Sequence, residues 1–148
     1  MNTVDITQKM KDMKFGNVNE NNILDYLNKN VSNKIQKTKY KYALMDYYEN
    51  SEDGKRIAEY EVKSRRIKHN QYKSLIFGKN KFDNSVIQID KNIRQIYLFN
   101  CIDGIYKWEL TDVNKQKDEY YFCMNGNFAR NDKAHSVCNI KTQYLTKI

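Results

Sequence analysis

The stretch that decides the fold is Ile57-Ala58-Glu59-Tyr60-Glu61-Val62-Lys63. Its positions 58, 60 and 62 are apolar or aromatic, and positions 59, 61 and 63 are charged, which is a period of two. Successive side chains of a β-strand point to opposite faces, so this pattern predicts a half-buried strand. We therefore expect Glu61 and Lys63 to lie side by side on its polar face.

A second strand is predicted just before this one. Residues 40–48 are rich in aromatic and apolar side chains, and the cluster at residues 49–54 that follows is typical of a turn. The two strands would form a hairpin that brings Asp46 within reach of the cation bound by Glu61. Such a pair suits Mg2+, which proteins hold through one or two carboxylates together with water and substrate phosphate.

The position of the triplet Glu61-Val62-Lys63 carries more information than its composition. Two other acid-x-lysine triplets occur, at residues 12–14 and 53–55. One lies in a polar stretch and the other in the expected turn, where side-chain directions are not fixed. Only the third lies on an alternating strand. The chemistry that it suggests is hydrolysis at phosphorus, with a cation that neutralises phosphate charge and the Lys63 ammonium acting on water or on the transition state.

At these residues the chain resembles the PD-(D/E)XK nuclease superfamily. The family has an acid at the end of one strand, then an acid, any residue and a lysine on the next, and Asp46, Glu61 and Lys63 match these positions. Met45 stands where the family often has proline. The resemblance spans residues 16–103, a helix, three-strand and helix-strand core, and is to small phage or large-DNA-virus members. It implies an α/β (α+β) fold with a restriction-endonuclease-like mixed sheet flanked by helices.

The resemblance also implies an activity and further site residues. The expected activity is that of a Mg2+- or Mn2+-dependent deoxyribonuclease, an endonuclease. Many members carry a glutamate on a preceding helix, and Glu20 is the candidate, because it precedes apolar residues with helical spacing, which are Ile23, Leu24, Leu27 and Val31. The expected metal ligands are Asp46, Glu61 and the backbone carbonyl of Val62. The expected catalytic residues are Glu20, Asp46, Glu61 and Lys63.

The charge of the chain favours a nucleic-acid partner. The sequence has 26 Lys and Arg against 18 Asp and Glu, a formal net charge of +8, and residues 26–45 and 62–82 contain no acid. Contacts to phosphate supply most of the sequence-independent affinity for nucleic acids. We expect DNA as the partner, with RNA left open, and a lysine-rich solvated surface is the plainer interpretation. The expected nucleic-acid-binding residues are Arg65, Arg66, Lys68, Lys73, Lys79 and Lys81.

The remaining sequence predicts one domain over residues 1–148, with an N-terminal arm at 1–15, the core at 16–103 and a strand extension at 104–148. Asp103-Gly104 is a turn signal between two apolar runs. The C-terminal hairpins are expected to extend the sheet of the core. After the strand at 57–63, the elements expected along the chain are a strand at 74–77, a helix at 83–92, and strands at 94–102, 105–110, 119–124 and 137–144.

The three cysteines, Cys101, Cys123 and Cys138, lack the paired spacing of a disulfide or zinc framework. With His135, a zinc site of three cysteines and one histidine stays open as an alternative. The odd cysteine count and the lack of a secretory signal predict an intracellular, reducing compartment, and no apolar run has the length to span a membrane. The Asn- and Lys-rich, proline-free composition suggests a viral or phage source, and a homodimer is a further expectation.

Several alternatives to a nuclease remain at this level. The charged face of the strand is also compatible with an ordinary surface ion pair, or with a family member that kept the fold and lost activity. A non-catalytic nucleic-acid-binding or packaging protein would use the same basic surface. The tyrosines near the motif, Tyr47, Tyr48 and Tyr72, either stack on bases or pack in the sheet, and packing is favoured.

Overall fold

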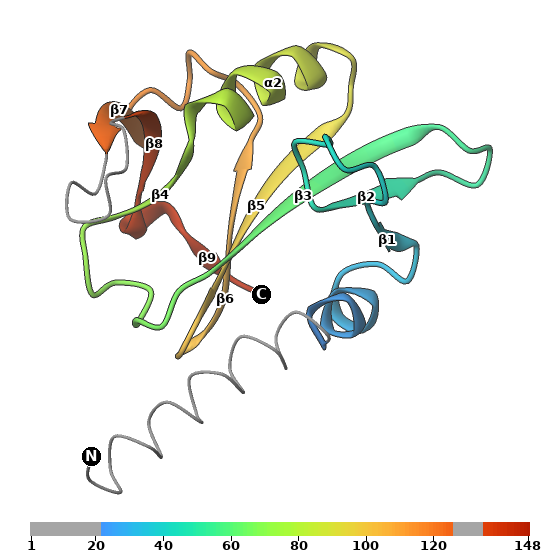
Figure 1. Cartoon of the computed structure of the whole chain (residues 1–148), viewed down its shortest axis with the longest axis horizontal. Coiled ribbons are helices and arrows are strands. Elements are labelled where there is room, and N and C mark those ends of the chain that lie inside the picture. Colours follow the sequence, from blue (N-terminus) through green and yellow to red (C-terminus); the bar gives the residue numbers. More distant parts are fainter. Residues whose placement is uncertain (1–21, 126–134) are drawn as a thin grey trace, which may run out of the picture.

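The computed structural model describes residues 22–125 and 135–148, and these form a mixed α/β structure with two sheets (Figure 1). The larger sheet has the order β1-β2-β3-β5-β6-β9 and the smaller one the order β4-β8-β7. A helix covers residues 22–30. The other elements are β1 (Ile35–Lys37), β2 (Tyr47–Asn50), β3 (Arg56–Ser64), β4 (Ser74–Gly78), α2 (Lys79–Asp90), β5 (Arg94–Cys101), β6 (Gly104–Leu110), β7 (Tyr120–Asn125), β8 (His135–Lys141), a 3-10 turn (Thr142–Tyr144) and β9 (Thr146–Lys147).

The centre of the larger sheet is the parallel pair β3 and β5, in which Glu61 lies opposite Tyr97. The other strand pairs of this sheet are antiparallel. All residues of β5 except the first are buried, as is typical of a strand that is covered on both faces. The mixed α/β class expected from the sequence is thereby confirmed.

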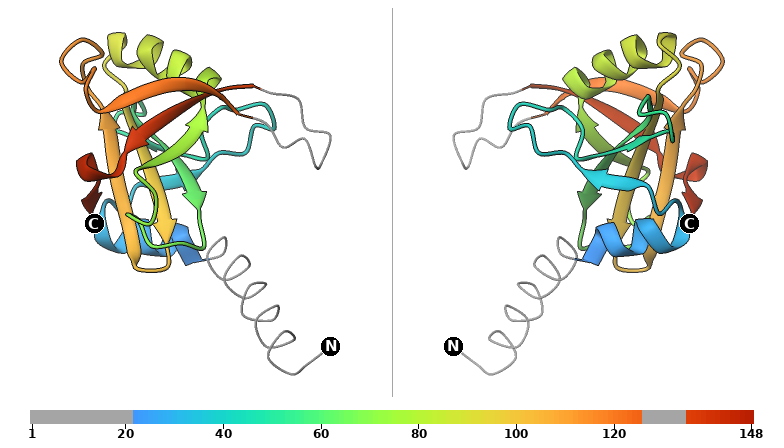
Figure 2. Two further views of the ribbon diagram at one scale, coloured as in Figure 1. Left: turned by 90° about the vertical axis from the view of Figure 1, so that its left-hand side faces the viewer. Right: turned by 90° about the vertical axis from the view of Figure 1, so that its right-hand side faces the viewer.

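Each face of the larger sheet has its own apolar core. On one face Ile96 and Leu98 pack with Ile23 and Leu27 of the helix over residues 22–30. On the other face the alternate residues of β5, which are Tyr97, Phe99 and Cys101, pack beneath α2 and the smaller sheet. The helix over residues 22–30 and α2 therefore lie on opposite sides of the larger sheet (Figure 2). Because Ala58 and Tyr60 belong to the first core, the charged face of β3 points towards α2.

A buried chain of polar groups holds α2 against this charged face. The Ser85 hydroxyl donates to Gln95 Oε1 at 2.8 Å, and the Gln95 amide donates to Glu59 Oε1 at 2.9 Å. The Tyr97 hydroxyl contacts Ser85 and donates to the backbone carbonyl of Lys81 at 3.1 Å. These bonds fix the rotation of α2 and so the position of its first turn over β3.

The strand expected at residues 40–48 is wrong in its first part. Only Tyr47–Asn50 pair as β2, and the turn begins at Ser51. The neighbour of β2 on its outer side, β1, is three residues long, and its last residue, Lys37, lies opposite Tyr47. Residues before Tyr47 thus have no strand to pair with on that side, and they form a loop.

Of the strands expected after Gly104, only the one at 105–110, which is β6, extends the larger sheet, and the short β9, which was not expected, adds to it beyond β6. The strands predicted at 119–124 and 137–144 exist as β7 and β8, but they pair with β4 in the smaller sheet. The strand expected at 74–77 is β4, and it too lies outside the larger sheet. Pairing of Phe77 with Cys138 lets both side chains face the core beneath α2, which explains this arrangement.

The other elements expected from the sequence agree with the structure to within a few residues. The helix expected at 83–92 is α2, and the turn at Asp103-Gly104 joins β5 to β6 with Gly104 at a φ of 139°. None of the helices in the described part of the chain has the length and apolar character needed to cross a bilayer. The expected arm at residues 1–15 lies outside the described residues.

The buried polar chain gives a prediction about stability. Ser85→Ala removes the donor to Gln95 Oε1, which would be left buried without this bond, and we expect the free energy of unfolding to fall by about 1–3 kcal/mol. Urea unfolding followed by circular dichroism measures the change. The control is Ile87→Ala on the exposed side of the same helix, for which we expect a change within about 0.5 kcal/mol. Equal losses for both variants would contradict the role of the polar chain.

Candidate active site

Glu61 is a buried carboxylate at the centre of the charged face of β3. Glu61 is only 2% exposed, because the first turn of α2 lies over its side chain. Its Oε1 forms ion pairs with the ammonium groups of Lys81 and, at 3.5 Å, of Lys63. Within the described residues its second oxygen, Oε2, is buried and has no hydrogen-bond partner. The two oxygens of this carboxylate are therefore in different environments, since Oε1 has two ammonium partners and Oε2 has none in the described chain.

Asp46 reaches the same site from the residue before β2. Tyr47 pairs with Tyr60, so the register places Asp46 opposite Glu61. The Asp46 carboxylate accepts a hydrogen bond from the backbone N–H of Val62 at 2.9 Å. This bond ties Asp46 to the residue between Glu61 and Lys63. The sequence prediction that Asp46, Glu61 and Lys63 lie together on a hairpin agrees with these contacts.

The electrostatics of the site reflect its burial. Loss of solvent raises the pKa of Glu61 above its ordinary value, the charge of Asp46 raises it further, and Lys81 and Lys63 act in the opposite direction. Burial likewise lowers the pKa of Lys63, and the neighbouring charge of Lys81 adds to this effect. A carboxylate and an amine that are each disfavoured in the charged state are typical of functional sites.

Lys81 is a site residue whose role the sequence did not reveal. We expected it to bind nucleic acid, and the structure gives it Glu61 as its partner. No local signal connects the two residues, which lie 20 positions apart. They meet only because α2 crosses the charged face of β3.

The remaining basic residues fall into two groups. Lys79 lies in the first turn of α2, where its ammonium pairs with Asp83 at 3.0 Å and lies 5.3 Å from the centre of the Phe122 ring. The other four follow β3 in the segment before β4 and are Arg65, Arg66, Lys68 and Lys73. Glu20, the expected helix acid, lies outside the described residues. Val62 contacts the site through its N–H, and a role for its carbonyl stays a prediction.

The donors at the site fit a hard divalent cation. No group of three or more His, Cys, Asp or Glu gathers anywhere in residues 22–125 and 135–148, so the described donors are the carboxylates of Asp46 and Glu61. Two carboxylates are a sufficient protein contribution for Mg2+, which keeps several waters. The buried Glu61 Oε2, without a hydrogen-bond partner in this part of the chain, is the oxygen that such a cation would satisfy.

The zinc alternative receives no support from the cysteines. Cys101 and Cys138 are buried in the core beneath α2, whereas Cys123 is exposed. Burial raises the pKa of the Cys138 thiol to about 12, which disfavours the thiolate that zinc requires.

Comparison with known proteins gave no match to any family model, curated protein or solved structure.

The raised pKa of Glu61 predicts a pH-dependent effect of Glu61→Gln in metal-free buffer. The folded protein binds this proton more tightly than the unfolded chain does, so ionised Glu61 lowers stability as pH rises above about 4.5. We expect the substitution to raise the melting temperature at pH 8, because the Gln side chain carries no charge that folding must remove from water. The gain should disappear as the pH falls towards 4.5.

Differential scanning calorimetry between pH 4.5 and pH 8 checks this prediction. Glu52→Gln is the matched control, because the side chain of Glu52 is 91% exposed. A melting temperature of Glu61→Gln that is equal to or below the wild-type value at pH 8 would show that the lysines outweigh the burial of the charge.

Proposed function

We propose that this chain is a metal-dependent endonuclease that hydrolyses phosphodiester bonds in DNA. The observation that carries the proposal is the buried Glu61 carboxylate, which shares its face of β3 with Lys63 and has Asp46 opposite it in register. A buried charge lowers stability unless it is paired, and here one of its oxygens has no hydrogen-bond partner in the described chain. Such an arrangement is expected where a site binds a cation.

The succession of elements supports a restriction-endonuclease-like fold for the proposed nuclease. The core of the PD-(D/E)XK superfamily that the sequence resembles is a helix, three strands, a helix and a strand. The chain runs through the helix over residues 22–30, then β1, β2 and β3, then α2 and β5, with β4 as an addition before α2. Glu61 and Lys63 lie on β3 as the family pattern has it, whereas Asp46 directly precedes β2 and so lies at the beginning of a strand, not at its end.

In the proposed mechanism each side chain has a separate role. Asp46 and Glu61 would hold Mg2+ or Mn2+, with Glu20 and the Val62 carbonyl as further candidates. When bound, the cation supplies charge neutralisation at the phosphate and makes water more acidic. Lys63 is 3.5 Å from Glu61 Oε1, and its lowered pKa makes it suited to orient water or to donate a proton. Lys81 neutralises Glu61 while the cation is absent.

One observation favours the alternative of a non-catalytic nucleic-acid-binding or packaging protein. Glu61 Oε1 already has two ammonium partners, and a closed ion-pair network of this kind would need no metal. The two functions differ in whether purified protein cleaves DNA, which the following variants test.

Lys63→Ala should lower the rate of Mg2+- or Mn2+-dependent DNA cleavage by about 100- to 10,000-fold, the range for loss of a positioned acid–base group. Glu61→Gln should also lower this rate strongly, because it removes a proposed ligand of the cation. DNA binding should survive, because contacts to phosphate come from other lysines and arginines. Gel assays of a plasmid and of flap, junction and single-stranded oligonucleotides measure cleavage, and fluorescence anisotropy measures binding.

The matched control is the chance triplet in the β2–β3 turn. Asp53→Asn and Lys55→Ala change an acid and a lysine at the same spacing in an exposed turn, and both variants should keep wild-type cleavage. If the wild type cleaves neither DNA nor RNA with any divalent cation, the nuclease proposal is lost and the non-catalytic alternative remains.

Lys81→Met removes the ammonium group that pairs with Glu61 and should therefore strengthen the binding of a metal ion at this carboxylate. Lys81 and a divalent cation would compete for Glu61, so we expect the Kd for Mn2+ to fall by about tenfold, or 1.4 kcal/mol. Isothermal titration calorimetry of the free protein measures the affinity. Lys79→Met is the control, since Lys79 pairs with Asp83 in the same turn of α2. An unchanged Kd in Lys81→Met would show that the ammonium does not occupy the cation site.

A further inference from the structure

The loop over residues 38–46, hereafter the tyrosine loop, begins and ends at the candidate active site. The backbone N–H of Thr38 donates to the carbonyl of Asp46 at 2.8 Å and closes the loop at its base. A turn at the tip is fixed by the Ala43 N–H, which donates to the Tyr40 carbonyl at 3.1 Å. Met45 is buried in the core beneath α2. The loop is therefore anchored at both the core and Asp46.

Two tyrosine rings project from this loop into solvent. Tyr40 and Tyr42 are 70% and 72% exposed, more than any other large hydrophobic residue in the described chain. The rings contact each other edge to face, with centroids 5.8 Å apart. Exposed aromatic surface of this kind lowers solubility and marks interaction sites. The pair thus offers a surface on which a flat aromatic ligand could stack.

The charges around the rings identify the chemistry of that ligand. Lysines alternate with the loop residues at positions 37, 39 and 41, and all three are exposed. The Lys41 ammonium lies 5.7 Å from the centre of the Tyr42 ring, and residues 26–45 contain no acid. Aromatic rings interleaved with cations are the means by which proteins bind single-stranded nucleic acid, since bases stack on the rings and phosphates meet the cations.

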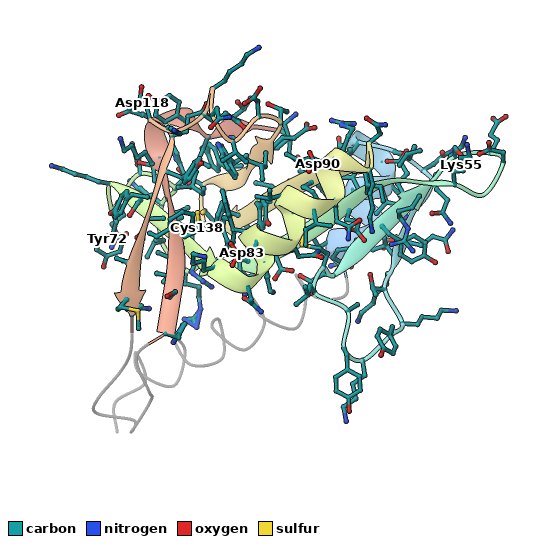
Figure 3. The ribbon with its side chains drawn as sticks, turned by 90° about the horizontal axis from the view of Figure 1, so that it is seen from above. Lys55, Tyr72, Asp83, Asp90, Asp118 and Cys138 are labelled. Carbon is teal, nitrogen blue, oxygen red and sulfur yellow. The ribbon has the colours of Figure 1, made fainter. Side chains whose placement is uncertain are left out.

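A pocket beside the loop provides room for an unpaired base. It has a volume of about 270 Å3 and opens between the loop, β3 and α2. Its side chains offer both a stacking surface and hydrogen-bonding groups, and they include Tyr42, Leu44, Arg56, Glu59, Asn84 and Gln88. Figure 3 shows the loop projecting from the body of the molecule, away from Tyr72.

We propose that the tyrosine loop binds an unpaired, single-stranded segment of the DNA substrate, with bases stacked on Tyr40 and Tyr42. The inference deepens the proposed nuclease function and rests on it for the identity of the bound molecule as substrate. It assigns the substrate class to DNA with single-stranded character, such as a flap, an overhang or an open junction. Because the loop closes at Asp46, the rings belong to the same loop as one of the site carboxylates.

The test is fluorescence anisotropy in EDTA, where no cleavage occurs, with a labelled 12-nucleotide oligo-dT and a blunt DNA duplex. Tyr40→Ala and Tyr42→Ala should each raise the Kd for oligo-dT by about tenfold, as expected for loss of a stacked base. Binding of the duplex should change less than twofold. Tyr42→Phe keeps the ring and should bind oligo-dT like the wild type.

Tyr72→Ala is the matched control, because Tyr72 is also a strongly exposed tyrosine, 59% exposed, but lies away from the loop. An oligo-dT affinity that is no weaker in the loop variants than in this control overturns the proposal, as does an equal loss for oligo-dT and duplex. A 12-nucleotide oligo-U is measured in parallel, and a loss of affinity for oligo-U without a loss for oligo-dT overturns the assignment to DNA. Since the assay measures binding without metal, a protein that never cleaves DNA would end the nuclease proposal and leave this result unaffected.

Discussion

β3 and β5 run parallel, so the chain between them must cross from one end of the sheet to the other before it can pair again. The crossing segment holds β4 and α2, and α2 runs over the face of β3 that carries Glu59, Glu61 and Lys63. Burial of Glu61 follows from this geometry, and so does the meeting of Glu61 with Lys81. The polar chain through Ser85 and Tyr97 then fixes how α2 is rotated. The parallel direction of β3 and β5 therefore determines which side chains meet at the site.

The arrangement is costly for stability, which bears on why it exists. A buried carboxylate is stabilised by its attraction to two lysine ammonium groups. The free energy needed to remove these charges from water offsets much of that stabilisation. An apolar residue at position 61 would pack against Tyr97 without this penalty. Proteins keep such destabilised groups mainly where they act on a ligand. The direction of the Glu61 pKa agrees with this view, because burial dominates over both lysines.

The sequence was sufficient for elements in which local pattern and tertiary environment agree. The alternation in β3, the apolar run of β5 and the Asp103-Gly104 turn each predicted the structure, and with β3 came the shared face of Glu61 and Lys63. It failed at residues 40–46, where strand-forming tyrosines lack a strand to pair with. The smaller sheet and the partner of Lys81 could not be predicted either, since both depend on contacts between residues that are distant in sequence.

The pairing of β4 with β8 has a consequence for how the chain folds. Residues Ser74 and Lys141 are neighbours in this sheet, so the intervening chain must be closed into a large loop before their contacts form. Closure of this kind slows folding, because its entropy is lost before the distant contacts stabilise the product. During synthesis, the strands of the larger sheet up to β6 leave the ribosome before β8 does. Phe77 of β4 therefore lacks its pairing partner, Cys138 of β8, until the end of the chain has been made. A chain in which β8 has not yet paired would therefore expose apolar surface beneath α2, and exposed surface of this kind favours aggregation.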